Sequence, residues 1–319
     1  MKHEFYLIIN SQSGGGYGNE LGQQLIQLLT KTGETVTPFF TKQAGDEAVF
    51  AKELVKMALI PFDEQATYDT FPLLVVLGGD GTLSHVVNAL SDYPDVPIAY
   101  IPAGSGNDFS RAAGIYTREL ATALSNILNV SKPARLQVMD VLERNHAKTF
   151  TLVNSFGIGL DGAVIQHMAK SPLKSRLNKL KLGGLAYPLT LANVLFSQGT
   201  FAATIQGEGI SKTYENIFLL TTTNHPYFGG GIKIVPHADL FEPGLDLIVI
   251  EKKSWRRFIQ IAIKLLQGKH LEHEDVHHFH GKAFNVHIQD PQYAQGDGEL
   301  QQFQPFDLKF SQSARYFWL

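Results

Sequence analysis

Apolar and polar positions alternate in two different ways along this chain. Over the first 130 residues, short apolar runs alternate with segments whose apolar residues recur every three or four positions. Continuous short runs are typical of buried strands, and the three-to-four spacing is typical of helices packed on one side. This alternation predicts a doubly wound α/β unit with a parallel sheet. The predicted strands are 4–10, 35–41, 73–77 and 96–102.

Beyond Ser131-Lys132-Pro133 the pattern changes to strand-like runs separated by turn clusters. It predicts a mostly antiparallel, sandwich- or barrel-like unit, interrupted by helical stretches near 183–197 and 254–267. We therefore predict an α/β domain over 1–131 and a β-rich domain over 132–307, with 308–319 as a candidate return to the first domain. The predicted strands are 136–143, 149–159, 201–206, 214–224, 245–251, 283–288 and 306–312.

Composition narrows the function classes. A chain of 319 residues is long enough for two domains, and its net charge of −3 gives no basic field for nucleic acid. The chain contains no cysteine, which excludes disulfides, thiolate catalysis and cysteine-based zinc sites. The N-terminal residues lack the apolar core of a signal peptide, and no apolar run is long enough to span a bilayer. We expect a cytoplasmic protein.

The apolar run 73–77 leads directly into Gly78-Gly79-Asp80-Gly81-Thr82, and an amphipathic helix pattern follows. A glycine turn between a buried strand and a helix start lets the backbone approach an anion, and the first N–H groups of the helix point at it. Asp80 would repel bare phosphate, so we expect a magnesium ion between carboxylate and phosphate. The alternative is a turn that serves packing alone.

A second glycine loop, 102–109, follows the next predicted strand. It contains Gly104, Ser105 and Gly106, then Asn107 and Asp108 at a predicted helix start. One interpretation is that Asn107 or Asp108 caps that helix. The other is that both glycine loops face one crevice at the carboxyl ends of neighbouring strands and hold a triphosphate from two sides.

Together the segments GGDGTLSHVVNAL (78–90) and IPAGSGNDFSRAAGI (101–115) resemble the catalytic domain of the diacylglycerol kinase and sphingosine kinase family, above all its soluble bacterial lipid kinases. GGDGT alone is shared with NAD kinases, but further segments resemble the family in the same order. The resemblance implies an NAD kinase/diacylglycerol kinase-like fold with a β-sandwich-like second domain. The further segments are Asn10, 156–161, 228–231, 242–246, 268–270 and 297–299.

The resemblance implies transfer of the ATP γ-phosphoryl group to a lipid hydroxyl, with ATP and Mg2+ as cofactors and diacylglycerol, converted to phosphatidic acid, as the leading substrate. Asp80 is the implied partner of the nucleotide-bound magnesium and one of the implied catalytic residues. The implied nucleotide contacts are Asn10, Thr41, Gly78, Gly79, Asp80, Gly81, Thr82, Leu83, Ser84, Gly104, Ser105, Asn107 and Asp108.

The catalytic base is expected in Asp297-Gly298-Glu299. On an extended segment, carboxylates two residues apart point the same way and both reach one site. A carboxylate beside the acceptor hydroxyl can take its proton. The resemblance implies Glu299 as the proton acceptor, with Asp297 as the contender. The alternative is an Asp-Gly hairpin turn whose two carboxylates are solvated.

A structural magnesium site is implied at a second segment, where the family has DGxLD. Here Glu242 replaces the aspartate and Pro243 follows it. The implied ligands are the Glu242 carboxylate and the carbonyls of Asp239 and Gly244. A plain turn is an equally good interpretation of this segment.

Two further departures from the family's sequence pattern concern charge. His85 stands where the family commonly has an acidic residue, and the glycine-rich loop 13–18 lacks the basic residue often found there. Lys174, Lys179 and Lys181 are candidates to supply that positive charge, although a solvated basic face explains such a run equally well.

Two more stretches allow alternative interpretations. His278 and His280 share one face of a strand while His277 points away, and no zinc-enzyme pattern accompanies them. The segment 255–266 combines apolar and basic residues, which suits either a helix packed on the sandwich or peripheral contact with an anionic membrane.

The sequence thus predicts a lipid kinase that meets a lipid substrate, with peripheral contact at the inner membrane surface as a further hypothesis. Strand 35–41, placed at an edge by Pro38, allows a homodimer. The alternatives are an NAD kinase-like small-molecule kinase and a weakly catalytic lipid- or nucleotide-binding regulator.

Overall fold

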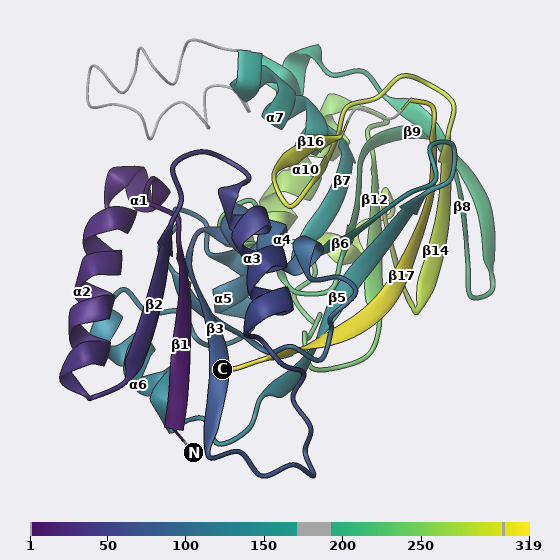
Figure 1. Cartoon of the computed structure of the whole chain (residues 1–319). Coiled ribbons are helices and arrows are strands. Elements are labelled where there is room, and N and C mark those ends of the chain that lie inside the picture. Colours follow the sequence, from purple (N-terminus) through teal and green to yellow (C-terminus); the bar gives the residue numbers. More distant parts are fainter. Residues whose placement is uncertain (1, 171–192, 302–303) are drawn as a thin grey trace.

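The computed structural model describes residues 2–170, 193–301 and 304–319. Figure 1 shows an α/β half built from the beginning of the chain beside a β-rich half built from the remainder. The lysines at 174, 179 and 181, and most of the predicted helical stretch 183–197, lie outside the described residues.

A parallel sheet with strand order β2-β1-β3-β4 forms the α/β half. Both of its faces are covered, because α2 and α6 share one apolar core with the strands and α3 and α4 share another. These elements are β1 (Lys2–Ile9), α1 (Ser13–Gly16), α2 (Gly18–Lys31), β2 (Thr35–Phe40), α3 (Asp46–Met57), β3 (Thr70–Gly78), α4 (Asp80–Ala89), β4 (Ile98–Pro102), α5 (Asp108–Ala112) and α6 (Leu120–Asn129).

The β-rich half is mostly antiparallel and encloses its own apolar core. Within it, β9 pairs with β7, β8 and β12. The elements are β5 (Ala134–Glu143), β6 (Lys148–Leu152), β7 (Ser155–Gly159), α7 (Leu160–Lys170), β8 (Phe201–Gly207), β9 (Ile210–Thr223), β10 (Tyr227–Phe228), β11 (Ile232–Lys233), β12 (Leu245–Glu251), α10 (Trp255–Leu266), η2 (His270–Glu272), β13 (Val276–Gly281), β14 (Ala283–Ile288), β15 (Ala294–Gly296), β16 (Glu299–Gln301) and β17 (Phe306–Phe317).

The long strand β17 joins the two halves. Its first residues pair with β14 and lie in the sandwich core, and it pairs with β5 over most of its length. At its end Phe317 pairs with Ile98 of β4, and Trp318 is buried in the core of the α/β half. Figure 1 shows this strand running from the β-rich half to the C-terminus in the α/β half. All but two of the described strands therefore belong to one 15-stranded sheet.

The predicted fold class is confirmed, and most of the predicted strands form. Strand 35–41 is the edge strand β2, as predicted. The predicted single run 149–159 is wrong, because it divides into β6 and β7 at Val153 and Asn154, whose N–H groups bind a carboxylate. Of the helices that the structure describes, none combines the length and the apolar character needed to cross a bilayer.

Candidate active site

The two glycine loops touch each other at the carboxyl ends of β3 and β4. A Cβ atom on Gly104 would lie 2.6 Å from the Cα atom of Gly79, which is too close for any side chain. Gly78 is needed for a similar reason, since a Cβ there would meet the Thr82 side chain at 2.6 Å. The glycines therefore allow two loops and a helix start to converge on one point.

Asp80 connects the two glycine loops and also lines a cavity. Its carboxylate accepts hydrogen bonds from the backbone N–H groups of Asp108 (3.1 Å) and Phe109 (3.2 Å), the first residues of α5. Burial raises the pKa of Asp80, and these backbone donors oppose the increase. The acid of the first glycine turn thus caps the helix that follows the second.

Asn107 and Asp108 do not cap α5 with their own side chains. Asn107 lies in the left-handed region (φ 56°), and its amide exchanges two 2.9 Å hydrogen bonds with the backbone of Gly104. The interpretation of Asn107 or Asp108 as a cap is therefore wrong, because Asp80 takes that place. Asn107 fixes the shape of the second loop instead.

Asp108 has one oxygen without a partner. Its Oδ2 accepts the N–H of Gly230 at 2.8 Å, whereas its buried Oδ1 makes no hydrogen bond to any described residue. Burial raises its pKa, and the neighbouring Asp80 charge adds to the increase. Two nearby carboxylates, one with a free oxygen, suit a magnesium ion that takes its other ligands from phosphates and water.

A polar cleft of about 800 Å³ opens in front of the glycine loops. Asn10 donates to the Thr82 hydroxyl at 2.8 Å, and the Ser11 hydroxyl donates to the Thr41 carbonyl at 2.8 Å, so the loops after β1 and β2 are tied to its walls. Eight predicted site residues line it, namely Asn10, Thr41, Gly79, Gly81, Thr82, Gly104, Ser105 and Glu299.

A smaller cavity of about 190 Å³ lies against the other side of the same loops. Asp80, Asp108 and Asp297 line it together with Asp161, which is hydrogen-bonded to Gln295. Burial raises the pKa of Asp161 to about 7. Ile165, Tyr227 and Phe228 add apolar surface. The small cavity therefore combines carboxylates with an apolar wall.

Four of the residues predicted to contact the nucleotide line neither the polar cleft nor the small cavity. Leu83 is fully buried in the core beneath α4, Gly78 lies behind Thr82, and Asn107 holds Gly104. Ser84 is buried, and its hydroxyl is one of the groups that lower the pKa of Asp297. These residues shape the site from behind.

The two carboxylates of 297–299 do not share an extended segment, so that prediction is wrong. Asp297 (φ 49°) and Gly298 (φ 87°) form the tight turn between β15 and β16. The Asp297 carboxylate turns inward and accepts the N–H groups of Val153, Asn154 and Ser155 at 2.8–3.0 Å. Burial nevertheless raises its pKa to about 6. The alternative prediction of an Asp-Gly hairpin turn is therefore correct for the turn. It is wrong for the carboxylate of Asp297, which is buried and not solvated.

Glu299 lies on the side of this turn that faces the polar cleft, and its side chain is 62% exposed. Its Oε1 is 3.7 Å from Nε2 of His85, whose Nδ1 is hydrogen-bonded to the buried Glu47 of α3. The Glu47 hydrogen bond is the main cause of a raised pKa at His85. The residue that departs from the family pattern is thus held in the cleft wall by Glu47.

The segment 239–244 forms a turn that is closed by its own hydrogen bonds. The Asp239 carbonyl accepts the N–H of Glu242 at 3.2 Å, and its carboxylate accepts the N–H of Phe241 at 2.9 Å. Glu242 is exposed, and the ring of His280 lies against Gly244. These groups do not fit a metal site as they stand, and the structural magnesium there stays a prediction.

His278 and His280 do share a face, and both contact the buried Asp246 of β12, at 2.7 and 3.1 Å. His277 points away and contacts Glu251. Within residues 2–170, 193–301 and 304–319, no group of three or more histidine and acidic side chains is arranged to hold a metal ion.

Sequence reasoning missed several cleft residues. Lys42 and Gln43 follow the predicted Thr41, and Glu47 belongs to the next helix. Their position after a parallel strand was the available signal. Gln295 gave no such signal, because its role depends on contact with Asp161 across the fold.

Family comparisons agree with this geometry. Residues 4–141 match the model of the diacylglycerol kinase catalytic domain. Residues 154–314 match the model described as the YegS C-terminal NAD kinase beta sandwich-like domain. The two matches follow the order of the α/β half and the β-rich half.

Individual relatives extend over nearly the whole chain. The Bacillus subtilis protein YtlR, which carries the provisional name of a lipid kinase, is 28% identical over 318 residues, covering 98% of each chain. A diacylglycerol kinase of the same organism is 28% identical over 92% of this chain and 88% of its own. A crystal structure of a Bacillus anthracis diacylglycerol kinase has the same fold, with a TM-score of 0.64 at 18% identity over 97% of this chain and 93% of that one. The chain therefore belongs to the diacylglycerol kinase catalytic-domain family of lipid kinase-like proteins.

Proposed function

We propose that this protein transfers the γ-phosphoryl group of ATP to a lipid hydroxyl, converting diacylglycerol to phosphatidic acid. The observation that carries the proposal is that the polar cleft and the small cavity lie next to each other. The polar cleft and the small carboxylate-lined cavity share the first glycine turn and the 297–299 turn as walls. A donor in one space and an acceptor in the other would be in contact across Asp80 and Asp297.

The polar cleft suits the nucleotide. Gly79, Gly81 and Gly104 expose backbone to it, and the N-terminus of α4 opens toward it. Such a helix start favours negative charge. Lys42 supplies a side-chain cation on the same walls. The cleft therefore offers both backbone donors and positive charge to a triphosphate.

The cation would be held by Asp80 and the free oxygen of Asp108. When bound, magnesium neutralises charge on the transferring phosphoryl group. Both carboxylates have pKa values raised by burial, so a cation would also relieve the cost of keeping them ionised. Asp80, held by α5, keeps a fixed position for this task.

The proton of the acceptor hydroxyl would pass to Asp297. This carboxylate lines the small cavity, whereas Glu299 lines the nucleotide cleft, which makes Asp297 the better placed of the two. A pKa near 6 allows it to be ionised at neutral pH and still accept a proton in the reaction. As the hydroxyl oxygen bonds to the γ-phosphorus, its proton moves to Asp297 and ADP leaves.

Lipid as the acceptor class is supported by the apolar wall of the small cavity. Ile165, Tyr227 and Phe228 line the same cavity as the carboxylates. A primary hydroxyl on an apolar body would place its oxygen at the carboxylates and its carbon atoms on this wall. A charged sugar acceptor would find no cation among the described residues that line the cavity.

The test is phosphate transfer from labelled ATP into a total lipid extract, with the product identified by mass spectrometry. Asp80→Asn is expected to lower turnover by roughly 100-fold or more, because a charge next to the reacting phosphates is lost. The matched control is Asp92→Asn, since Asp92 is an exposed aspartate that lines neither space. The control should be as active as the wild type.

Other outcomes would reassign the protein. Phosphorylation of NAD with no labelled lipid would make it a small-molecule kinase, which shares the glycine turn and the sandwich type. Nucleotide binding without transfer to any acceptor would make it a regulator. Equal lipid turnover by wild type and Asp80→Asn would exclude the mechanism proposed for Asp80.

A further inference from the structure

Helix α10 presents an apolar stripe to solvent. Trp255, Ile259, Ile263 and Leu266 are spaced by four, four and three residues, which places them on one face. They are 41%, 54%, 51% and 88% exposed. Phe196 is 76% exposed, and its ring centroid is 5.0 Å from that of Trp255. We call these five side chains the α10 patch.

A second face of the same helix explains why the patch cannot turn inward. Phe258, Ile261 and Leu265 pack into an apolar cluster with residues of β9 and β12. The helix therefore has more apolar surface than its contact with the sheet can cover. Scattered single apolar residues are ordinary on a protein surface, but a contiguous patch of this kind marks an interaction site.

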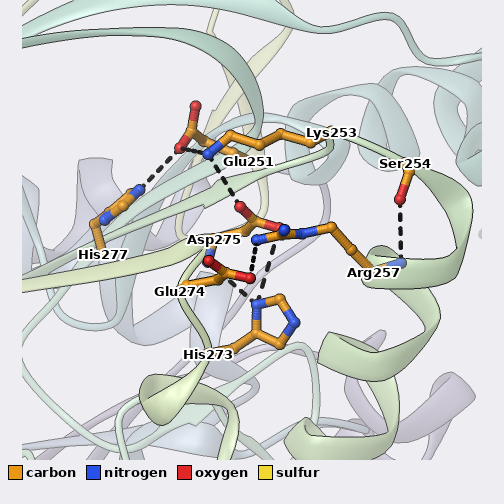
Figure 2. A network of polar contacts seen from close by, with 8 residues as sticks. All are labelled: Glu251, Lys253, Ser254, Arg257, His273, Glu274, Asp275 and His277. Carbon is orange, nitrogen blue, oxygen red and sulfur yellow. Dashed lines mark hydrogen bonds and ion pairs between the residues drawn. The ribbon is translucent and has the colours of Figure 1, made fainter.

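Ion pairs fix the start of α10 in this orientation, as Figure 2 shows. The buried Asp275 is paired with Arg257 and with Lys253, whose Nζ is 3.0 Å away. Ser254 caps the helix by accepting the N–H of Arg257 at 3.4 Å. Lys252 lies 3.8 Å from the centre of the Trp255 ring. The tryptophan is thus held at the surface.

The charges that remain near the patch are positive. Arg257 and Lys253 are neutralised by the pairs in Figure 2. Arg256, Lys264 and Lys269 form no ion pair with any described acidic residue, and no acid occurs from 254 to 271. An apolar stripe with a tryptophan and unpaired cations beside it complements an anionic lipid surface.

We propose that the α10 patch docks this protein on anionic membranes, with Arg256, which borders the apolar stripe on the helix, facing the lipid phosphates. A second copy of the chain fits less well, because twofold contact through α10 would bring the Arg256 side chains of the two copies toward each other. The inference adds to the proposed lipid kinase activity a route by which the enzyme meets a substrate confined to a bilayer. Docking itself needs neither nucleotide nor turnover.

The experiment is cosedimentation of the full chain with vesicles in the absence of ATP. Phosphatidylglycerol vesicles should bind the wild type, phosphatidylcholine vesicles should bind it much less, and added salt should weaken binding. The triple variant Ile259→Gln, Ile263→Gln, Leu266→Gln should lower the partition coefficient by roughly tenfold or more, since each apolar side chain inserted contributes. Arg256→Gln should lower it by roughly fivefold on anionic vesicles only.

The matched control is Val49→Gln with Met57→Gln. These residues are 53% and 71% exposed on α3, away from α10, and the control should bind vesicles like the wild type. The α10 variants should also keep wild-type turnover of a short-chain diacylglycerol dissolved as monomers. That readout separates a failure of docking from a failure of the proposed activity.

Unchanged vesicle binding by the α10 variants would overturn the proposal. So would a wild-type dimer that dissociates in the triple variant while vesicle binding is unaffected, because the patch would then be an interface between copies. Equal loss in the α3 control would also contradict it, since binding would depend on general surface hydrophobicity.

Discussion

Asp80 meets two requirements with one side chain. It holds the backbone N–H groups at the start of α5, and it faces the small cavity beside Asp108. The sequence predicts the second role, because a carboxylate inside a phosphate-type turn calls for a cation. The first role depends on contact with residues 28 and 29 positions away, which no local pattern reports.

Asp297 and Glu299 can be told apart by mutation. Asp297→Asn is expected to lower kcat by roughly 100- to 10,000-fold, because it removes the proton acceptor of the small cavity. Glu299→Gln should have a smaller effect, mainly on the KM for ATP, since Glu299 lies in the polar cleft. The measurement is steady-state kinetics with both substrates varied, and the reverse order of effects would assign the base to Glu299.

The pH profile gives an independent check of the same assignment. With the pKa of Asp297 near 6, wild-type kcat/KM should fall as the pH drops below about 6. Glu299→Gln should keep this acidic limb. A limb that disappears in Glu299→Gln would contradict the assignment of Asp297.

His85 and Glu47 should stabilise the fold within a limited pH window. The pKa of His85 is raised above 6.5, so its contribution is present below that value and lost as the pH rises through the folded-state pKa. Burial opposes ionisation of Glu47, but His85 lowers its pKa below 4.5, so that contribution is lost in acid. The pair of His85 and Glu47 is therefore most stabilising at pH values between the folded-state pKa of Glu47 and that of His85.

The stability difference between wild type and His85→Gln should accordingly be largest near pH 6 and shrink above it. Thermal unfolding measured across pH checks this. His287→Gln, at an exposed histidine of β14, should show no such trend. A His85→Gln difference that does not vary with pH would mean that the Glu47 contact is unimportant in solution.

At the scale of elements, periodicity predicted the strands of the parallel sheet and the helices between them. Their apolar residues are buried on both faces, so the pattern reports burial directly. It failed at 149–159 and at 297–299, where one Asp297 carboxylate binds three backbone N–H groups. Apolar periodicity contains no information about a hydrogen-bond partner 142 to 144 residues away.

At the same scale, the close contact between the two glycine loops can be tested by mutation. Gly104→Ala should destabilise the fold by about 1–3 kcal/mol, because the new Cβ meets the backbone of Gly79, which cannot move aside. Gly81→Ala has open space around its Cβ and lies in α4, so it should be neutral or stabilising by about 0.5–1 kcal/mol. Urea denaturation of both variants tests the contrast, and equal effects would contradict it.

At the scale of the whole molecule, the sequence suggests that residues 308–319 return to the first domain. It does not suggest how many apolar cores this segment joins. The pattern of 306–312 predicts a strand, and nothing in it indicates that this strand and the residue after it contribute to three apolar cores. Phe310 lies in the sandwich core, and Phe317 and Trp318 lie in the two cores of the α/β half. Only the folded topology reveals this.

Trp318 should accordingly be a major determinant of stability. Its ring is fully buried and lies 5.7 Å from that of Phe71, and its indole N–H donates to the Ile127 carbonyl. Trp318→Ala should cost about 3–5 kcal/mol. The other tryptophan, Trp255, is exposed on α10, and Trp255→Ala should cost much less.

The two tryptophans also report on the two halves separately. Within each variant that keeps only Trp318 or only Trp255, the fluorescence transition should coincide with the unfolding of the whole chain followed by circular dichroism, because β17 belongs to both halves. Fluorescence measures this directly. Two separated transitions would show that the halves unfold independently.

The shared strand also limits how the enzyme can move. Many kinases close on their substrates by rotating two lobes about a flexible linker. Here the polar cleft and the small cavity are built on one continuous sheet, and rotation would have to shear the β5–β17 ladder, which is ten residue pairs long. The catalytic cycle is therefore expected to proceed with an almost constant radius of gyration, and small-angle scattering with and without nucleotide would detect a departure from that stiffness.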